Sequence, residues 1–174
     1  RLPIPDVSLH MIFAGNPGTG KTTVARLIAN IFAQIGVLRN GQLVEVDRSG
    51  LVAGFVGQTA IKTSEVIARS LDGVLFIDEA YSLADRGSQD FGNEAIETLL
   101  KEMEDKRGRL IVIVAGYTNR MTAFIESNPG LKSRFSRVIE FPDYTASELR
   151  FIADHMVEQH HFLLEQDARD ALGH

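Results

Sequence analysis

The residues from Gly15 to Thr22 read Gly-Asn-Pro-Gly-Thr-Gly-Lys-Thr and match the pattern G-x-x-x-x-G-K-[ST]. Glycines allow the backbone to curl so that successive N–H groups face an anion. Lys21 can reach the β- and γ-phosphates of a nucleoside triphosphate, and the Thr22 hydroxyl can coordinate Mg²⁺. The other residues expected to surround the phosphates are Asn16, Pro17, Gly18, Thr19, Gly20 and Thr23. Because an apolar run precedes the loop and a helical pattern follows it, a chance glycine-rich turn is disfavoured. The pattern predicts binding of ATP or GTP with Mg²⁺.

Two acidic residues, Asp78 and Glu79, follow directly after the apolar run 74–77. Four consecutive apolar residues indicate a strand that is buried on both faces, as in the centre of a parallel sheet. A carboxylate at the carboxyl end of such a strand can hold Mg²⁺, which is the role expected for Asp78. A carboxylate one residue further can orient and deprotonate the attacking water, so Glu79 is the candidate catalytic base. The alternative is an ordinary pair of strand-end carboxylates, and the phosphate-binding loop upstream disfavours it.

The elements that must position these residues are visible as short apolar runs that alternate with helical patterns. Strands are expected at residues 9–14, 43–47, 74–78, 110–115 and 138–141. Between the first two, apolar residues recur with the spacing of an amphipathic helix: Val24, Leu27, Ile28, Ile31, Phe32 and Ile35. Gly36 is placed to end this helix, and further helices are expected near 60–71, 93–106 and 121–126. The sequence therefore predicts an α/β fold in three layers around a parallel five-stranded sheet.

The composition changes after Pro142, and a separate helix is expected there. Thr145 and Glu148 have the spacing of a capping box. One face of the helix that follows is apolar: Leu149, Ile152, Ala153, Met156 and Val157. No strand follows that this helix could support. We expect residues 1–143 to form the α/β subdomain and residues 144–174 to begin a second, helical subdomain that is cut short.

The overall composition limits the kinds of partner. A net charge of −5 and a pI near 5.5 argue against broad binding to nucleic acid or to an anionic membrane. The chain has no cysteine, which excludes disulfides and fits a cytoplasmic protein. No apolar run approaches the ~20 residues needed to cross a bilayer, so no membrane association is expected. Because the chain starts with Arg1 and stops inside an apparent element, we expect it to be a piece of a longer protein.

The phosphate-binding loop, the Asp-Glu pair and the later segment Gly-Leu-Lys-Ser-Arg-Phe (130–135) together resemble the AAA+ ATPases. Longer segments resemble one branch of that family: 15–26, 75–83, 115–117, 128–131 and 141–144. This branch contains stage V sporulation protein K, the red-type Rubisco activase and the ATPase of type VII secretion. The resemblance covers essentially the whole chain. It implies the AAA+ core fold, ATP and Mg²⁺ as cofactors, and a truncated helical lid from residue 144.

The same resemblance implies three further roles. Arg134 matches the arginine finger that completes the ATP site of a neighbouring subunit, with a solvated surface arginine as the alternative. The polar sensor residue after the fourth strand corresponds to Thr118 or Asn119, and Asn119 is favoured. Phe55 and Val56, flanked by glycines, match the central pore loop with which such ATPases grip a polypeptide. A core position is the alternative for Phe55, because aromatic residues are more often buried than exposed.

The resulting hypothesis is the ATP-binding and ATP-hydrolysing core of a ring-forming motor, a homo-hexamer that remodels a protein client. The alternative is a conformational switch or assembly module in which turnover is incidental, and an intact Glu79 disfavours it. A small-molecule kinase using the same loop would leave the Ser-Arg-Phe segment unexplained. Nothing in the residues identifies the client. Since the resemblance implies a second sensor and a base-contacting segment outside this chain, we expect the isolated chain to be weakly active.

Overall fold

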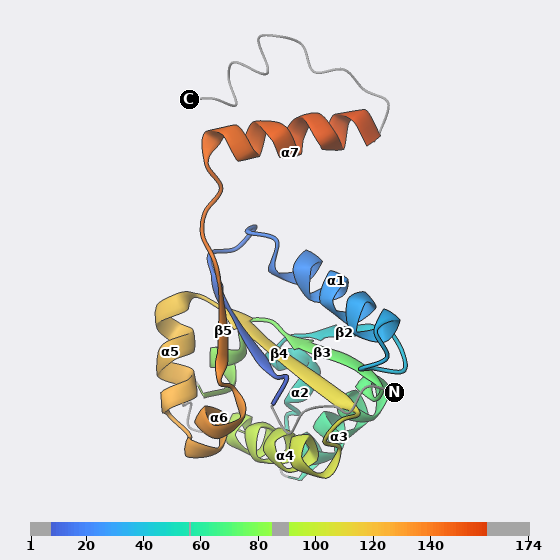
Figure 1. Cartoon of the computed structure of the whole chain (residues 1–174). Coiled ribbons are helices and arrows are strands. Elements are labelled where there is room, and N and C mark those ends of the chain that lie inside the picture. Colours follow the sequence, from blue (N-terminus) through green and yellow to red (C-terminus); the bar gives the residue numbers. More distant parts are fainter. Residues whose placement is uncertain (1–7, 56, 85–90, 160–174) are drawn as a thin grey trace. The chain divides into compact units, whose positions relative to one another are not determined.

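The sheet at the centre of the protein positions the candidate site. The computed structural model describes residues 8–55, 57–84 and 91–159, and it confirms the expected α/β class (Figure 1). The described strands form one five-stranded sheet in the order β2-β3-β4-β1-β5, and every neighbouring pair is parallel. The strands are β1 (Met11–Gly15), β2 (Leu43–Val46), β3 (Gly73–Ile77), β4 (Leu110–Gly116) and β5 (Arg137–Phe141). Each begins and ends within two residues of the range expected from the sequence.

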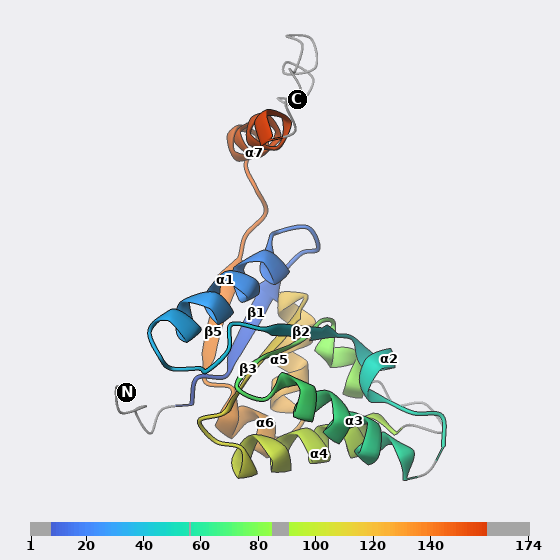
Figure 2. The ribbon, with the colours of Figure 1, turned by 90° about the vertical axis from the view of Figure 1, so that its right-hand side faces the viewer.

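Helices cover both faces of this sheet and complete the three layers (Figure 2). These helices are α1 (Lys21–Gln34), α2 (Arg48–Leu51), α3 (Gln58–Ser70), α4 (Gly92–Asp105), α5 (Thr118–Glu126) and α6 (Pro129–Arg134). A further helix, α7 (Ala146–Gln159), belongs to a separate unit of the chain. Alternate residues of β1 belong to two different cores, because successive side chains of a strand point to opposite faces. Met11 and Phe13 belong to the core on the α1 face, whereas Ile12 and Ala14 belong to the core that α3, α4 and α5 cover.

Helix α1 buries a narrower face than its apolar pattern suggested. Val24, Ile28 and Phe32 pack against the core on that side of the sheet. The other three apolar residues are about half exposed: Leu27, Ile31 and Ile35. The helix ends at Gln34, and Gly36 follows with a positive φ of 76°, as expected for a glycine at a helix end.

Three short elements were not expected from the sequence: α2, α6 and the 3₁₀ helix η1 (Ala80–Ala84). Each is too short to show helical periodicity. A local signal marks the start of α6, because Pro129 occupies its first turn and Asn128 caps it. The side-chain oxygen of Asn128 accepts a hydrogen bond of 2.8 Å from the Gly130 N–H.

The chain divides into two compact units, residues 1–141 and residues 142–174. The described part of the second unit contains α7, and its capping box is formed as expected. The Thr145 N–H donates to Glu148 Oε2 at 2.8 Å, and the Glu148 N–H donates to Thr145 Oγ1 at 3.3 Å. The Thr145 N–H, together with the Thr145 hydroxyl that also donates to Glu148 Oε2 at 2.8 Å, lowers the pKa of the Glu148 carboxyl. That this unit begins a lid stays a prediction.

Candidate active site

The phosphate-binding loop leaves β1 at a point where only glycine fits. A Cβ at Gly15 would collide with the carbonyl oxygen of Phe141 and lie 2.8 Å from the Phe141 Cβ on β5. Gly18 and Gly20 have positive φ angles of 77° and 87°, a region that residues with a Cβ rarely adopt. Gly20 occupies the N-cap position of α1. The glycine spacing therefore produces the curled backbone that the motif predicted.

Lys21, the first residue of α1, is folded back into the loop. Its Nζ donates to the carbonyl oxygens of Gly15 at 2.9 Å and Asn16 at 2.6 Å, and lies 3.5 Å from Thr19 Oγ1. Burial lowers the pKa of Lys21, and the nearby negative charge of Asp78 opposes that effect. A buried ammonium surrounded by a few neutral oxygens is poorly compensated, and phosphate oxygens would compensate it better.

The two acidic residues follow β3 as expected, but they differ in conformation. The Asp78 N–H continues the sheet by donating to the Val46 carbonyl at 2.8 Å. Asp78 Oδ1 accepts a 3.0 Å hydrogen bond from the Glu79 N–H. Glu79 is exposed and has a φ of +46°, a strained conformation for a residue with a Cβ. The sharp turn after the strand thus directs the two successive carboxylates differently.

These residues meet in one cavity of about 360 Å³ at the carboxyl ends of β1, β3 and β4. Of the residues predicted for the site, the following line it: Pro17, Gly18, Gly20, Lys21, Thr22, Thr23, Asp78 and Glu79. Asn16 and Thr19 are not among the lining residues, and both contact the Lys21 ammonium from behind. An ammonium, a hydroxyl and a carboxylate around a backbone cradle are the donor set that a Mg²⁺–triphosphate requires. The site therefore fits MgATP.

The structure does not bring the favoured sensor residue into this cavity. Thr118 and Asn119 form the exposed start of α5, whereas Gly116 and Tyr117 line the cavity. Sequence reasoning missed Tyr117 because the register depended on where β4 ends. The sensor assignment to Asn119 stays a prediction, and Tyr117 is the residue that follows β4 directly.

Tyr81, also missed, packs beside this edge of the cavity. The Tyr81 side chain is buried within η1, and the Arg120 guanidinium lies 5.0 Å above its ring centroid. The same guanidinium lies 6.0 Å from the centroid of Tyr117. Burial raises the pKa of the Tyr81 hydroxyl, and its hydrogen bond with Glu79 raises it further. The sequence feature that could have pointed to Tyr81 was its position two residues after Glu79.

Arg134 lies at the opposite end of the strands. Its carbonyl oxygen accepts a 2.6 Å hydrogen bond from Ser8 Oγ, before β1 begins. Along β1, the five residues Met11–Gly15 span roughly 16 Å, which is farther than an arginine side chain extends. Arg134 therefore cannot reach the phosphate loop of its own chain. Its guanidinium instead contacts Glu104, with 3.3 Å between Nη2 and Oε2.

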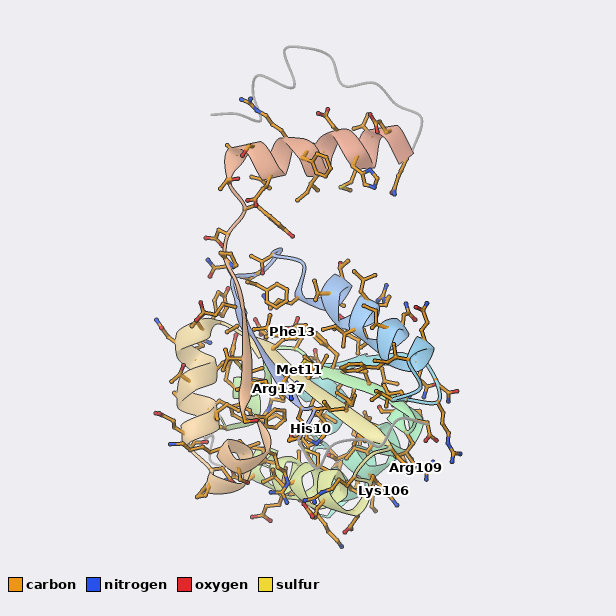
Figure 3. All side chains as sticks on the ribbon, viewed as in Figure 1. His10, Met11, Phe13, Lys106, Arg109 and Arg137 are labelled. Atoms are coloured by element: carbon orange, nitrogen blue, oxygen red, sulfur yellow. The ribbon has the colours of Figure 1, made fainter. Side chains whose placement is uncertain are left out.

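His10 shares this end of the sheet with Lys106 and Arg109 (Figure 3). Its Nδ1 accepts a 2.9 Å hydrogen bond from the Val112 N–H, so a neutral ring carries its proton on Nε2. Burial, together with the positive charges of Arg134 and Arg107, lowers the pKa of His10 to about 4.

The pore-loop prediction falls partly outside the described residues, because Val56 is not among them. Phe55 is 71% exposed, which excludes the core position that was its alternative. Gly57 follows with a φ of +76° and caps α3. The role of Phe55 in contacting a client stays a prediction.

Comparison with known proteins decides the family. The model of the family described as "ATPase family associated with various cellular activities (AAA)" matches residues 11–143. The chain belongs to the AAA family. This confirms the resemblance found in the sequence, and the residues that line the cavity all lie within the matched range.

Individual relatives of this AAA domain fall in the expected branch. It is 52% identical over 167 residues to stage V sporulation protein K of Bacillus subtilis (strain 168), covering 96% of the chain and 52% of the relative. It is 51% identical over 166 residues to protein CbbX of Cereibacter sphaeroides, covering 95% and 54%. With ESX-3 secretion system protein EccA3 of Mycolicibacterium smegmatis it shares 50% identity over 162 residues, covering 92% and 27%. The chain thus spans about half the length of the first two relatives and about a quarter of the third.

A solved structure supports the fold of the AAA domain. It is the crystal structure of the FIGL-1 AAA domain in complex with ADP, with a TM-score of 0.63 and 19% identity, covering 87% of this chain and 49% of that one. At that identity the likeness concerns the fold alone. Within the part of the AAA domain that the structure describes, no helix is both long and apolar enough to span a membrane.

Proposed function

We propose that this AAA domain binds MgATP in the 360 Å³ cavity and hydrolyses it, within a longer protein that remodels a protein client as a ring. The observation that carries the proposal is the convergence of Lys21, Thr22, Asp78 and Glu79 on one cavity. These four residues come from two segments of the chain, which meet because the carboxyl ends of β1 and β3 lie at the same edge of the sheet, on either side of β4.

Each residue has a role that its position supports. Lys21 exchanges the carbonyl oxygens of the loop for oxygens of the β- and γ-phosphates, while Thr22 and Asp78 hold the metal ion. The bound Mg²⁺ neutralises charge on the phosphates. Glu79, turned away from the line of β3 by its positive φ, accepts a proton from the attacking water.

The ring is supported by the position of Arg134. Because it cannot reach its own phosphate loop, an arginine finger at this position has to act on a neighbouring copy. In related phosphoryl-transfer systems, such an arginine raises the rate by about 10³- to 10⁵-fold. The exposed aromatic ring of Phe55 supports contact with a polypeptide client. A homo-hexamer is the assembly we propose.

The substitution Glu79→Gln in the full-length protein tests the hydrolysis step. Because the amide keeps the size of the side chain and loses the basic oxygen, ATP binding should persist while turnover falls about 10²- to 10⁴-fold. Binding is measured by titration with a fluorescent ATP analogue, and turnover by phosphate release. Glu65→Gln, an exposed glutamate on α3, is the matched control and should leave both unchanged. Unchanged turnover in Glu79→Gln would remove Glu79 from the mechanism.

A further inference from the structure

Glu104, at the carboxyl end of α4, contacts two arginines. The Arg107 Nη2 lies 2.7 Å from Glu104 Oε1 and 2.9 Å from Oε2, so this contact is close to both oxygens. The Arg134 Nη2 lies 3.3 Å from Oε2, across 30 residues of sequence. Arg107 therefore fixes the orientation of the carboxylate, and the carboxylate in turn holds one end of the Arg134 guanidinium.

The Arg134 guanidinium is held in place, but its N–H donors are not all matched by close hydrogen-bond acceptors. Its Nη1 makes only long contacts, 3.4 Å to the Gly130 carbonyl and 3.5 Å to Ser133 Oγ. Its Nε is buried and has no hydrogen-bond partner within the described part of the chain. A guanidinium offers five N–H donors. Because the contacts of Nη1 are long, this nitrogen keeps donor capacity for an additional acceptor.

The surroundings of the guanidinium favour an anion as that acceptor. Glu104, Arg107 and Arg134 line a cavity of about 480 Å³ at the amino ends of the strands, together with His10. Burial is the main cause of the lowered pKa of His10, and the charges of the two arginines lower it further, so two cations act at this cavity beside the carboxylate of Glu104. An exposed ion pair contributes little to stability. Glu104 and Arg107 are 50% and 68% exposed, so stability does not explain their arrangement.

We propose that Glu104, oriented by Arg107, is a positioning residue for Arg134: it holds the guanidinium at the edge of this cavity, where it meets the triphosphate bound to a second copy of the chain. The inference rests on the proposed function, because it takes Arg134 to act in trans. Glu104 keeps its contact with Nη2, while Nη1, whose own contacts are long, is left for the triphosphate.

The test uses mixed assemblies of two full-length variants. Lys21→Ala impairs its own nucleotide site and still offers Arg134, whereas Arg134→Ala keeps its site and lacks the finger. Mixing them should restore ATPase activity. Adding Glu104→Gln to the Lys21→Ala subunit should lower the restored turnover roughly 3- to 10-fold, because a misdirected catalytic group loses rate steeply. Adding it to the Arg134→Ala subunit should change nothing.

Matched variants separate positioning from folding. Glu97→Gln, an exposed glutamate on the same helix, should have no effect in either subunit. Arg107→Gln should show the same dependence on subunit as Glu104→Gln with a smaller effect, and it serves as the test if Glu104→Gln does not fold. If Glu104→Gln lowers the restored turnover equally in both subunits, or in neither, the positioning role of Glu104 is contradicted. The trans role of Arg134 is not affected by that result. No restored activity despite co-purification of differently tagged subunits contradicts the trans role of Arg134 and this proposal with it.

Discussion

At the scale of single residues, burial lowers the pKa of two basic side chains at opposite ends of the sheet. The pKa of Lys21 is lowered by burial, and the negative charge of Asp78 opposes the shift. The pKa of His10 is lowered by burial and by two arginines, and no opposing charge contributes among the causes of its shift. Burial therefore disfavours the cation at both ends of β1, and the two residues differ in whether a neighbouring charge opposes it.

His10 should make stability depend on pH. Its folded-state pKa of about 4 lies below the ordinary value of 6.5, so the unfolded chain binds the proton more readily. The contribution is fully present above pH 6.5 and is lost as the pH falls toward 4. At pH 5 the loss should be about 2 kcal/mol. Urea unfolding between pH 5 and pH 7 measures it.

The matched variant for this prediction is His10→Asn. Its side-chain oxygen can still accept the hydrogen bond that the Val112 N–H donates to His10 Nδ1. Since asparagine does not titrate, stability should change less between pH 7 and pH 5 than in the unmodified protein. Equal pH dependence in the two proteins would show that His10 does not carry the effect.

At the scale of elements, the sequence predicted what periodicity and burial determine. The five strands and the long helices α1, α3 and α4 follow from runs of apolar residues. The short helices α2, α6 and η1 depend on caps and on tertiary contacts, which periodicity does not report. The phosphate-binding loop and the two acids could be assigned because their residue types and spacing form a local motif. The position of the sensor residue could not be assigned in this way. It depends on Gly116 ending β4, so that Tyr117 faces the cavity.

Gly116 connects β4 to the nucleotide site, and Gly116→Ala should disturb both. An added Cβ would lie 2.6 Å and 2.9 Å from two ring carbons of Tyr81 and 3.1 Å from the Met121 sulfur. Because the ring is buried, it has to shift, and the free energy of unfolding should fall by about 1–3 kcal/mol. Nucleotide affinity should also fall, since the displaced ring contacts Tyr117 and Glu79, which both line the cavity.

The control for Gly116→Ala is Gly54→Ala, where an added Cβ would meet nothing within 4 Å. Its free energy of unfolding should stay within about 0.5 kcal/mol of the unmodified protein. Urea unfolding followed by circular dichroism compares the two variants. If Gly116→Ala is as stable as Gly54→Ala and binds nucleotide normally, the packing of Tyr81 does not constrain this edge of the site.

At the scale of the whole molecule, the two compact units differ in how their helices are stabilised. The first unit holds two hydrophobic cores and the nucleotide cavity. The second contributes α7, which has no buried residue and leaves Leu149, Phe151 and Met156 exposed by 45%, 74% and 56%. Helices of about this length are marginal in water without tertiary packing. The two units should therefore differ sharply in local stability.

Helices α4 and α7 allow a direct comparison, because each has 14 residues. In the 174-residue chain, backbone amides of α4 should be protected from hydrogen exchange, since Ile96, Leu99 and Met103 bury its inner face. Amides of α7 should exchange within roughly tenfold of the rate of an unstructured chain, because no residue of this helix is buried and a helix of this length is marginal without tertiary packing. Exchange followed by mass spectrometry at neutral pH resolves the two helices. Protection of α7 equal to that of α4 would mean that its apolar face is covered in solution, either by the first unit or by a second copy, and a dilution series would distinguish these because only the second depends on concentration.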